Sequence, residues 1–150
     1  SPALTSPKQQ LEIRLRCDDP LLYDASLSTV DFSTGQPDVP LGSGPSAPII
    51  TLTGPATDPT VTFRDSSGSV VATIGLTVTL ASGEKAIIDC RKHYVTDPSD
   101  TNHLNDWWTS GQFFEMDGSA HGGGEDGPYP TLEVDVSVGS AIAEYRKSWA

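Results

Sequence analysis

The chain has 150 residues, of which 36% are hydrophobic, and it is rich in Gly (14) and Pro (12); short strands joined by Gly/Pro turns in one domain fit this profile better than a helical bundle. Its 20 acidic and 9 basic residues give a formal net charge of -11, which argues against a nucleic-acid or anionic-membrane surface because phosphate contacts need clustered Lys and Arg. No apolar run has the length of a membrane-spanning helix, and no signal peptide opens the chain.

The first third of the chain predicts a leading segment, two strands and a loop. Residues 11–16 alternate between apolar and charged side chains, as on a half-buried strand, and a second strand is predicted in residues 25–32. Residues 34–47, with three prolines, are expected to form a long loop. The side chains expected to be buried are Leu11, Ile13 and Leu15 in the first strand, and Leu27, Val30 and Phe32 in the second.

Short apolar runs at the regular spacing of a sandwich fill the middle of the chain. Each run ends at residues typical of turns, such as the Asp-Ser-Ser-Gly sequence of residues 65–68. The predicted strands are residues 49–53, 60–64, 70–74 and 76–80.

The central stretch runs from Glu84 to Val95 and contains no Gly or Pro. A tight two-residue hairpin is therefore not indicated. We interpret the stretch as one long strand, or as two strands that continue through a bend, with Ile88 and Cys90 on one face. This interpretation places His93 on a strand.

One helical turn is predicted between residues 97 and 110. Asp97-Pro98 is a fair helix start, since Pro is tolerated at the first helical position. Leu104, Trp107 and Trp108 are spaced to share one helix face. A Gly-rich loop over residues 117–130 and strands at residues 132–136 and 141–149 complete the predicted elements.

Cysteine and histidine residues do not form a recognisable metal pattern. Cys17 and Cys90 lack the C-x-x-C spacing, so buried free thiols are expected, with one disulfide as the alternative. His93, His103 and His121 stand singly, and we predict no metal site and no cofactor.

The loop of residues 117–130 imitates two functional motifs without completing either. Asp117, Ser119 and His121 match early positions of a calcium loop, but Pro128 occupies the position of its bidentate acid, so a flexible loop is the better interpretation. His121 and the three glycines after it resemble an esterase oxyanion loop, yet no G-x-S-x-G nucleophile motif occurs. We predict no catalytic residues and no enzymatic activity.

The concentrated aromatic residues are the strongest candidate binding residues. Trp107 and Trp108 could form a platform for the apolar face of a sugar ring, with Asn105 and Asp106 for its hydroxyl groups. The alternative, which we favour, is that the rings cap one end of the sandwich core.

Three segments follow one another over residues 7–150. In the first, the predicted strand leads into Asp-Asp-Pro and then Tyr23; the second joins the Gly-Pro-x-x-x-Pro turn of residues 54–59 to residues 75–80, Gly-Glu and Ala-Ile-Ile-Asp. The third, residues 141–149, ends with an aromatic residue, Arg and Trp. In this order they resemble the C-terminal region of siphophage distal tail proteins and related phage minor tail proteins.

The resemblance implies a galectin-like or carbohydrate-module-like sandwich with no catalytic residues. It also implies a virion protein, assembled in the host cytoplasm, whose parent chain forms a hexameric ring where the tail tube meets the tip. The partners implied are the tail tube and tip or receptor-binding proteins, with a host-surface glycan as a further ligand. The belt domain that builds the family's ring has no counterpart in this sequence, so the piece alone is expected to be a monomer.

Together these observations predict an all-β, antiparallel two-sheet β-sandwich of the jelly-roll or galectin type, with at most one short helix. Residues 1–24 are expected to be a linker and a strand leading in from a belt domain, and residues 25–150 to be the sandwich. We predict a structural part of a phage tail that serves assembly, docking or host-surface contact. The alternative is a carbohydrate-binding module.

Overall fold

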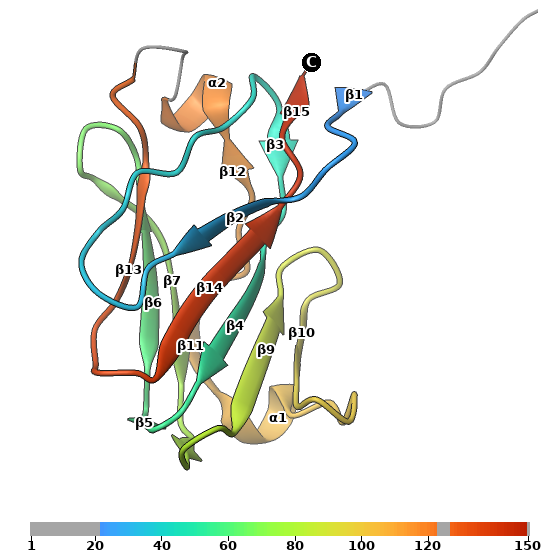
Figure 1. Cartoon of the computed structure of the whole chain (residues 1–150), viewed down its shortest axis with the longest axis vertical. Helices are drawn as coiled ribbons and strands as arrows, with labels where there is room; N and C mark the ends of the chain where they lie inside the picture. Colours follow the sequence, from blue (N-terminus) through green and yellow to red (C-terminus); the bar gives the residue numbers. More distant parts are fainter. Residues whose placement is uncertain (1–21, 123–126, 150) are drawn as a thin grey trace, which may run out of the picture.

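Two antiparallel sheets face one another in the computed structural model, which describes residues 22–122 and 127–149 (Figure 1). The larger sheet has five strands, in the spatial order β10-β9-β4-β14-β2. Their bounds are β2 Ser28–Asp31, β4 Ile49–Thr53, β9 Lys85–Asp89, β10 Tyr94–Thr96 and β14 Ser140–Tyr145.

The second sheet has four strands in the order β11-β7-β6-β13. They are β6 Thr60–Arg64, β7 Val70–Leu76, β11 Trp108–Gly111 and β13 Thr131–Val134. Three short pairs sit around the two sheets: β1 Leu22–Tyr23 with β15 Ser148–Trp149, β3 Pro45–Ser46 with β12 Met116–Asp117, and β5 Ala56–Thr57 with β8 Thr79–Leu80.

The core lies between the sheets because each strand turns alternate side chains inward. The five-stranded sheet contributes Ile50, Leu52, Ala86, Ile88, Ala141 and Ala143, and the four-stranded sheet contributes Val61, Phe63, Ala72, Ile74 and Leu132. The predicted antiparallel two-sheet sandwich is therefore confirmed, together with the strands at residues 49–53 and 60–64.

Neither form of the prediction for Glu84 to Val95, one long strand or two strands that continue through a bend, is correct, because the chain forms two strands that reverse direction. The chain reverses at residues 90–93, and β10 returns antiparallel to β9, with Tyr94 opposite Asp89. The Asp89 carboxylate accepts hydrogen bonds from the backbone N–H groups of Arg91 (3.0 Å) and Lys92 (2.9 Å). His93 adopts a positive φ of 60°, so it lies in the turn and not on a strand. Side-chain capture of the backbone replaces the missing Gly or Pro.

The strand boundaries around Gly75 also differ from the prediction, and β13 spans Thr131–Val134 where residues 132–136 are predicted. Strand β7 continues through Gly75 to Leu76, where an added Cβ would lie 2.7 Å from Ser110 Oγ on the neighbouring strand β11. The predicted strand over residues 76–80 is thus reduced to β8. The close approach of β11 explains why a glycine occupies a strand interior.

The last predicted strand, residues 141–149, is two strands, β14 and β15, which belong to different sheets. Along β14 the side chains of Ala141, Ala143 and Tyr145 are buried and therefore form its inward face. Near the start of the described chain, Val30 and Phe32 are buried as predicted, but Leu27 is 54% exposed because it precedes β2.

There are two helices among the described residues, each with four residues, and not at most one. Helix α1 spans Leu104–Trp107, so it begins seven residues after Asp97 and not at Asp97-Pro98. Helix α2 spans Gly118–His121 and begins where the Asp117 side chain accepts a hydrogen bond from the Ser119 N–H. Neither has the length or the apolar character needed to cross a membrane.

Some predictions concern residues outside the described ranges. They include the burial of Leu11, Ile13 and Leu15, the state of Cys17, and the leading segment in residues 1–24, of which only residues 22–24 are described. Cys90 is a free, buried thiol. The boundary between a leading segment and the sandwich remains a prediction.

Candidate functional site

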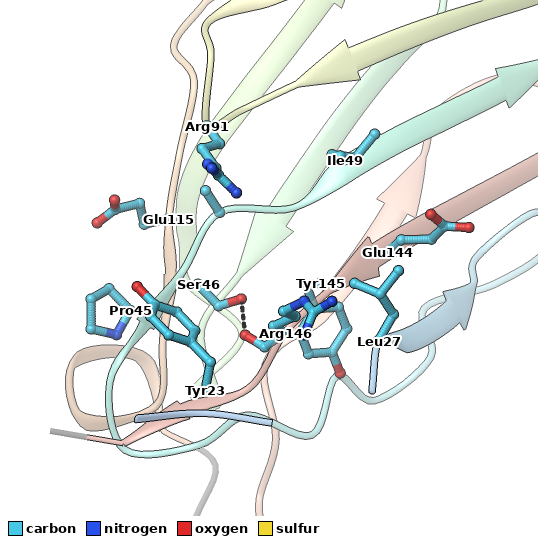
Figure 2. A pocket seen from close by; sticks show the side chains of 11 residues that line it. Tyr23, Leu27, Pro45, Ser46, Ile49, Arg91, Glu115, Glu144, Tyr145 and Arg146 are labelled. Carbon is cyan, nitrogen blue, oxygen red and sulfur yellow. Dashed lines mark hydrogen bonds between the residues drawn. The ribbon is translucent and has the colours of Figure 1, made fainter. Parts of the chain in front are cut away.

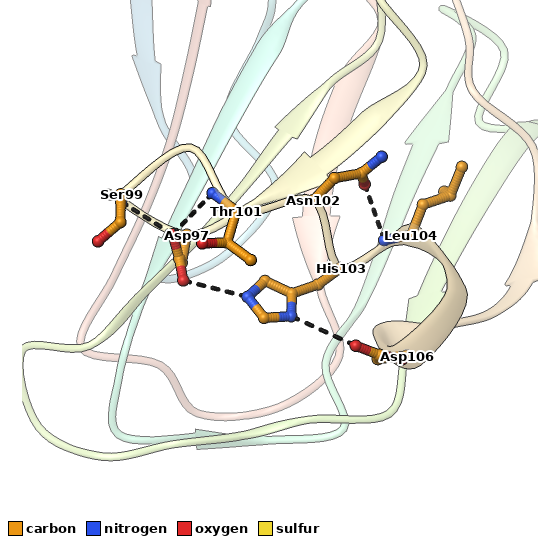
Figure 3. Close-up of polar contacts among 7 residues, drawn as sticks. All are labelled: Asp97, Ser99, Thr101, Asn102, His103, Leu104 and Asp106. Atoms are coloured by element: carbon orange, nitrogen blue, oxygen red, sulfur yellow. Dashed lines mark hydrogen bonds and ion pairs between the residues drawn. The ribbon is translucent and has the colours of Figure 1, made fainter.

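The loop between β10 and helix α1 is organised by the Asp97 side chain (Figure 3). Asp97 Oδ1 accepts hydrogen bonds from the backbone N–H groups of Ser99 (2.8 Å) and Thr101 (3.1 Å). A bridge between Thr96 and Asn102 closes the base of the loop. The loop is therefore held by its own side chains and backbone.

His103 lies between two carboxylates just before α1. Its Nε2 is 3.1 Å from Asp97 Oδ2, and its Nδ1 is 3.6 Å from Asp106 Oδ2 (Figure 3). The hydrogen bond with His103 is the main cause that lowers the pKa of Asp97 below its usual 3.8, assisted by the backbone N–H groups of Thr101 and Ser99. These contacts fix the orientation of the imidazole ring.

Helix α1 starts at Leu104 for a local reason. The Asn102 side chain accepts a hydrogen bond from the Leu104 N–H at 2.9 Å, which satisfies a backbone donor at the helix start. The residues after Pro98 cannot extend a helix backward because Asp100 has a φ of 61°, in the left-handed region.

The structure separates the two tryptophans of the predicted platform. Trp107 stacks on His103, with ring centroids 3.9 Å apart and planes 6° apart. Trp108 packs on Phe113 at 4.5 Å, and Phe113 stacks in turn on His93 at 4.9 Å. Both indoles are half-buried against the core.

The remaining residues of the predicted platform lie near Trp107. Asn105 and Asp106 are exposed on helix α1, and Asp106 Oδ2 lies 3.6 Å from the His103 ring. Of the predicted set, Trp107 and Trp108 thus belong to two separate ring stacks, and Asn105 and Asp106 lie on helix α1 beside Trp107.

A cleft of about 400 Å³ opens beside the Trp107–His103 stack. One wall comes from the β8–β9 region and the other from the β10–α1 loop. The polar side chains that line it are Thr79, Glu84, Lys85, Asp97, Ser99 and His103, and the apolar side chains are Val78, Leu80, Pro98 and Trp107. We call this cavity the α1 cleft. Its size is within the range typical of small-molecule sites.

The side chains of the α1 cleft are suited to binding a ligand. No described nucleophile hydrogen-bonds to His103, whose polar partners are carboxylates. Within residues 22–122 and 127–149, no three His, Cys, Asp or Glu side chains are grouped to hold a metal ion. The groups in the cleft can donate and accept hydrogen bonds and pack against an apolar ligand surface.

In the described part of the loop of residues 117–130, the residues that imitate a calcium loop form hydrogen bonds and ring contacts within the fold. Asp117 Oδ1 accepts from both the N–H (2.9 Å) and the Oγ (2.7 Å) of Ser119. His121 Nδ1 accepts from the Asp117 N–H at 3.0 Å, and its ring packs edge-on against Phe63. Desolvation alone would raise the pKa of Asp117, but the hydrogen bonds from Ser119 outweigh it, so the pKa lies below its usual value. These residues cap and anchor helix α2.

A second cleft, of about 560 Å³, lies beside β1, β3 and β14 (Figure 2). Its lining includes Arg91, Glu115 and Glu144 together with exposed apolar side chains. Five of the seven large hydrophobic side chains that are exposed among the described residues lie in or next to it: Leu22, Tyr23, Leu27, Ile49 and Trp149. We call these five the β1–β15 apolar face.

The two clefts are at opposite ends of the sandwich. Strands β1 and β15 and the last described residues lie at one end, and α1 with β5 and β8 lies at the other (Figure 1). One end of the domain therefore carries the apolar face, while the other carries the α1 cleft.

Comparison with known proteins gives a likeness of fold. No protein-family model matches the sequence, and no curated protein matches it. Among solved structures, the chain is similar to the SPP1 Dit protein (gp 19.1), described as a paradigm of the hub adsorption apparatus in phages that infect Gram-positive bacteria. The TM-score is 0.67 at 15% sequence identity, over 89% of this chain and 51% of that one.

What the two share is the fold. At 15% identity the likeness identifies the β-rich architecture, and this chain spans about half the length of the Dit chain.

Sequence reasoning missed most of the α1 cleft. Glu84 and Lys85 were assigned only to a strand, and His103 was treated as a single histidine. The spacing of Asp97, His103 and Asp106 is only a weak signal for this cluster. The two acids lie six residues before and three residues after the histidine, and they reach its ring only because a loop and a helical turn bring them there.

Proposed function

We propose that this chain is a non-enzymatic β-sandwich module of a bacteriophage tail hub, and thus a virion component. The observation that carries the proposal is the fold likeness to SPP1 Dit over 89% of the chain. The order of the three sequence segments that resemble distal tail proteins supports the same family independently of the fold. Fold alone does not fix function, so the surface of the domain has to carry features that suit the same role.

The β1–β15 apolar face supports a role in assembly. Leu22 is 72% exposed and Leu27 is 54% exposed, on a protein with a net charge of -11. Clustered exposed apolar side chains mark contact surfaces for other proteins. We assign this face to contact with another protein of the tail hub. Arg91 and Glu144 at its edge, which form no ion pair among the described residues, would give such a contact its orientation.

The full product of the gene that encodes this chain provides the test. We expect its mass in light scattering to be six times that of one chain, with rings visible by electron microscopy. Replacing Leu22 and Leu27 by Ser in the same product should reduce its incorporation into tails in a complementation assay. A full product that is monomeric and absent from purified virions would contradict the proposal.

A carbohydrate-binding module is the second candidate function. The observation that favours it is the half-buried Trp107 at the wall of the α1 cleft, at the end of the sandwich away from the apolar face. A tail protein anchored through β1 and β15 would point this cleft outward, where a host-surface glycan could reach it.

A further inference from the structure

We infer that the α1 cleft binds a neutral pyranoside, held between the Trp107–His103 stack and the Glu84–Lys85 pair. This inference rests on the second candidate function, carbohydrate binding, and gives it a site and a ligand class. It does not depend on the role in a tail hub.

The wall formed by Trp107 is held in place before any ligand arrives. The His103 ring is held at Nε2 by its hydrogen bond with Asp97, has Asp106 3.6 Å from Nδ1, and lies 3.9 Å from the Trp107 ring in a parallel stack. An aromatic wall that is already ordered loses little conformational entropy on binding. Pyranose rings present a face of C–H groups that packs favourably against such apolar surface.

The opposite wall supplies paired hydrogen-bonding groups. Glu84 Oε2 accepts a hydrogen bond from the Ala81 N–H at 2.8 Å, which orients the carboxylate and leaves Oε1 for a ligand. The Lys85 ammonium forms no ion pair among the described residues. A sugar hydroxyl both donates and accepts, so adjacent hydroxyls match a carboxylate beside an ammonium group.

The charges in the cleft exclude other ligand classes. Glu84 and Asp97 oppose Lys85, so an anionic ligand such as a phosphate meets two carboxylates for one ammonium. A divalent cation lacks a group of three described ligands there. A volume of about 400 Å³ accommodates one or two sugar rings. A neutral ligand with several hydroxyls and one apolar face fits what remains.

Of the two neighbouring tryptophans, only Trp107 lines the α1 cleft. Trp108 packs against Phe113 and is not among the residues that line the cleft. We therefore expect Trp107, and not Trp108, to respond to a sugar.

Nuclear magnetic resonance on the whole 150-residue chain tests the site directly. The three tryptophans give three indole N–H signals, assigned by Trp→Phe substitution at each. The probes are the methyl glycosides of glucose, galactose, mannose and N-acetylglucosamine, with the open-chain polyol sorbitol as a control. We expect at least one glycoside to shift the Trp107 signal in a saturable way, while Trp149 and the sorbitol titration show no change.

Two exposed substitutions keep the test independent of folding. Lys85→Ala and Glu84→Gln should each weaken binding about tenfold, the usual loss for one hydrogen bond to a charged group, with an unchanged melting temperature. Lys92→Ala, on the β9–β10 turn, is the matched control and should bind normally.

Saturable binding that shifts Trp108 but not Trp107, or that survives both substitutions, overturns the cleft assignment and keeps carbohydrate binding. No saturable shift with any of the four glycosides overturns the assignment and the second candidate function together, and leaves the hub proposal as it stands.

Discussion

The Cys90 side chain is 2% exposed, and burial raises the pKa of its thiol to about 12. The thiolate is the reactive form, so the folded protein should protect this residue. In a Cys17→Ser variant at pH 8, we expect no reaction with Ellman's reagent in the native state and one thiol per chain after denaturation. Reaction of the native variant at the rate of free cysteine would contradict the structure.

Asp97 is the second residue whose chemistry gives a prediction. Its pKa is lowered, chiefly by the hydrogen bond with His103, so the folded state favours the carboxylate. That contribution to stability is present above the pKa of unfolded Asp and is lost as the pH falls through the lower folded pKa. Asp97→Asn should therefore melt at a lower temperature than the parent at pH 7, and the difference should shrink in strong acid.

Asp106→Asn is the matched control for Asp97→Asn. Its carboxylate is farther from the His103 ring, at 3.6 Å, and its side chain is 72% exposed, so its loss should affect melting less. Equal losses for the two variants, or a difference at Asp97 that grows in acid, would show that the hydrogen bond between Asp97 and His103 does not stabilise the folded state as described.

At the scale of the element, the edge strand β11 depends on one glycine. Gly111 has a φ of 98°, and a Cβ there would overlap the Thr73 carbonyl oxygen on β7. Gly111→Ala should lower the free energy of unfolding by at least about 2 kcal/mol, since it combines backbone strain with a clash.

Gly68 offers a control with the same backbone strain and no clash. Its φ is 87°, with nothing within 4 Å of an added Cβ. Gly68→Ala should cost only about 1 kcal/mol. Urea unfolding of both variants measures the difference, and equal costs would mean that β11 does not pack on β7 as closely as described.

For the whole molecule, replacing leucines on the β1–β15 apolar face and in the core should have different effects on the free energy of unfolding. Replacing Leu22 and Leu27 by Ser in the isolated chain should change the free energy of unfolding by no more than about 0.5 kcal/mol, because both side chains are exposed. Leu52→Ala, at a fully buried position between the sheets, should cost about 3 kcal/mol.

Unfolding in urea followed by tryptophan fluorescence measures all three substitutions. A large loss from the Leu22 and Leu27 double variant would mean that the apolar face is part of this domain's own core. It would then not be a contact surface for another protein.

The sequence by itself determined the class of fold and the inward face of most described strands. Alternation with a period of two is a local property, so Ile50 and Leu52, or Ala141 and Ala143, identify their own buried face without reference to any other strand. The order of short strands and turns was enough to predict a two-sheet sandwich.

The tertiary structure alone decided where the chain reverses and which residues meet. The reversal after Asp89 depends on one carboxylate that captures two backbone N–H groups, which no apolar periodicity records. The α1 cleft joins Glu84 and Lys85 to His103 and Trp107, from segments separated along the chain and brought together only by packing. Leu27 is likewise predicted to be buried, yet it is 54% exposed, because burial depends on what covers a side chain and not on its own hydrophobicity.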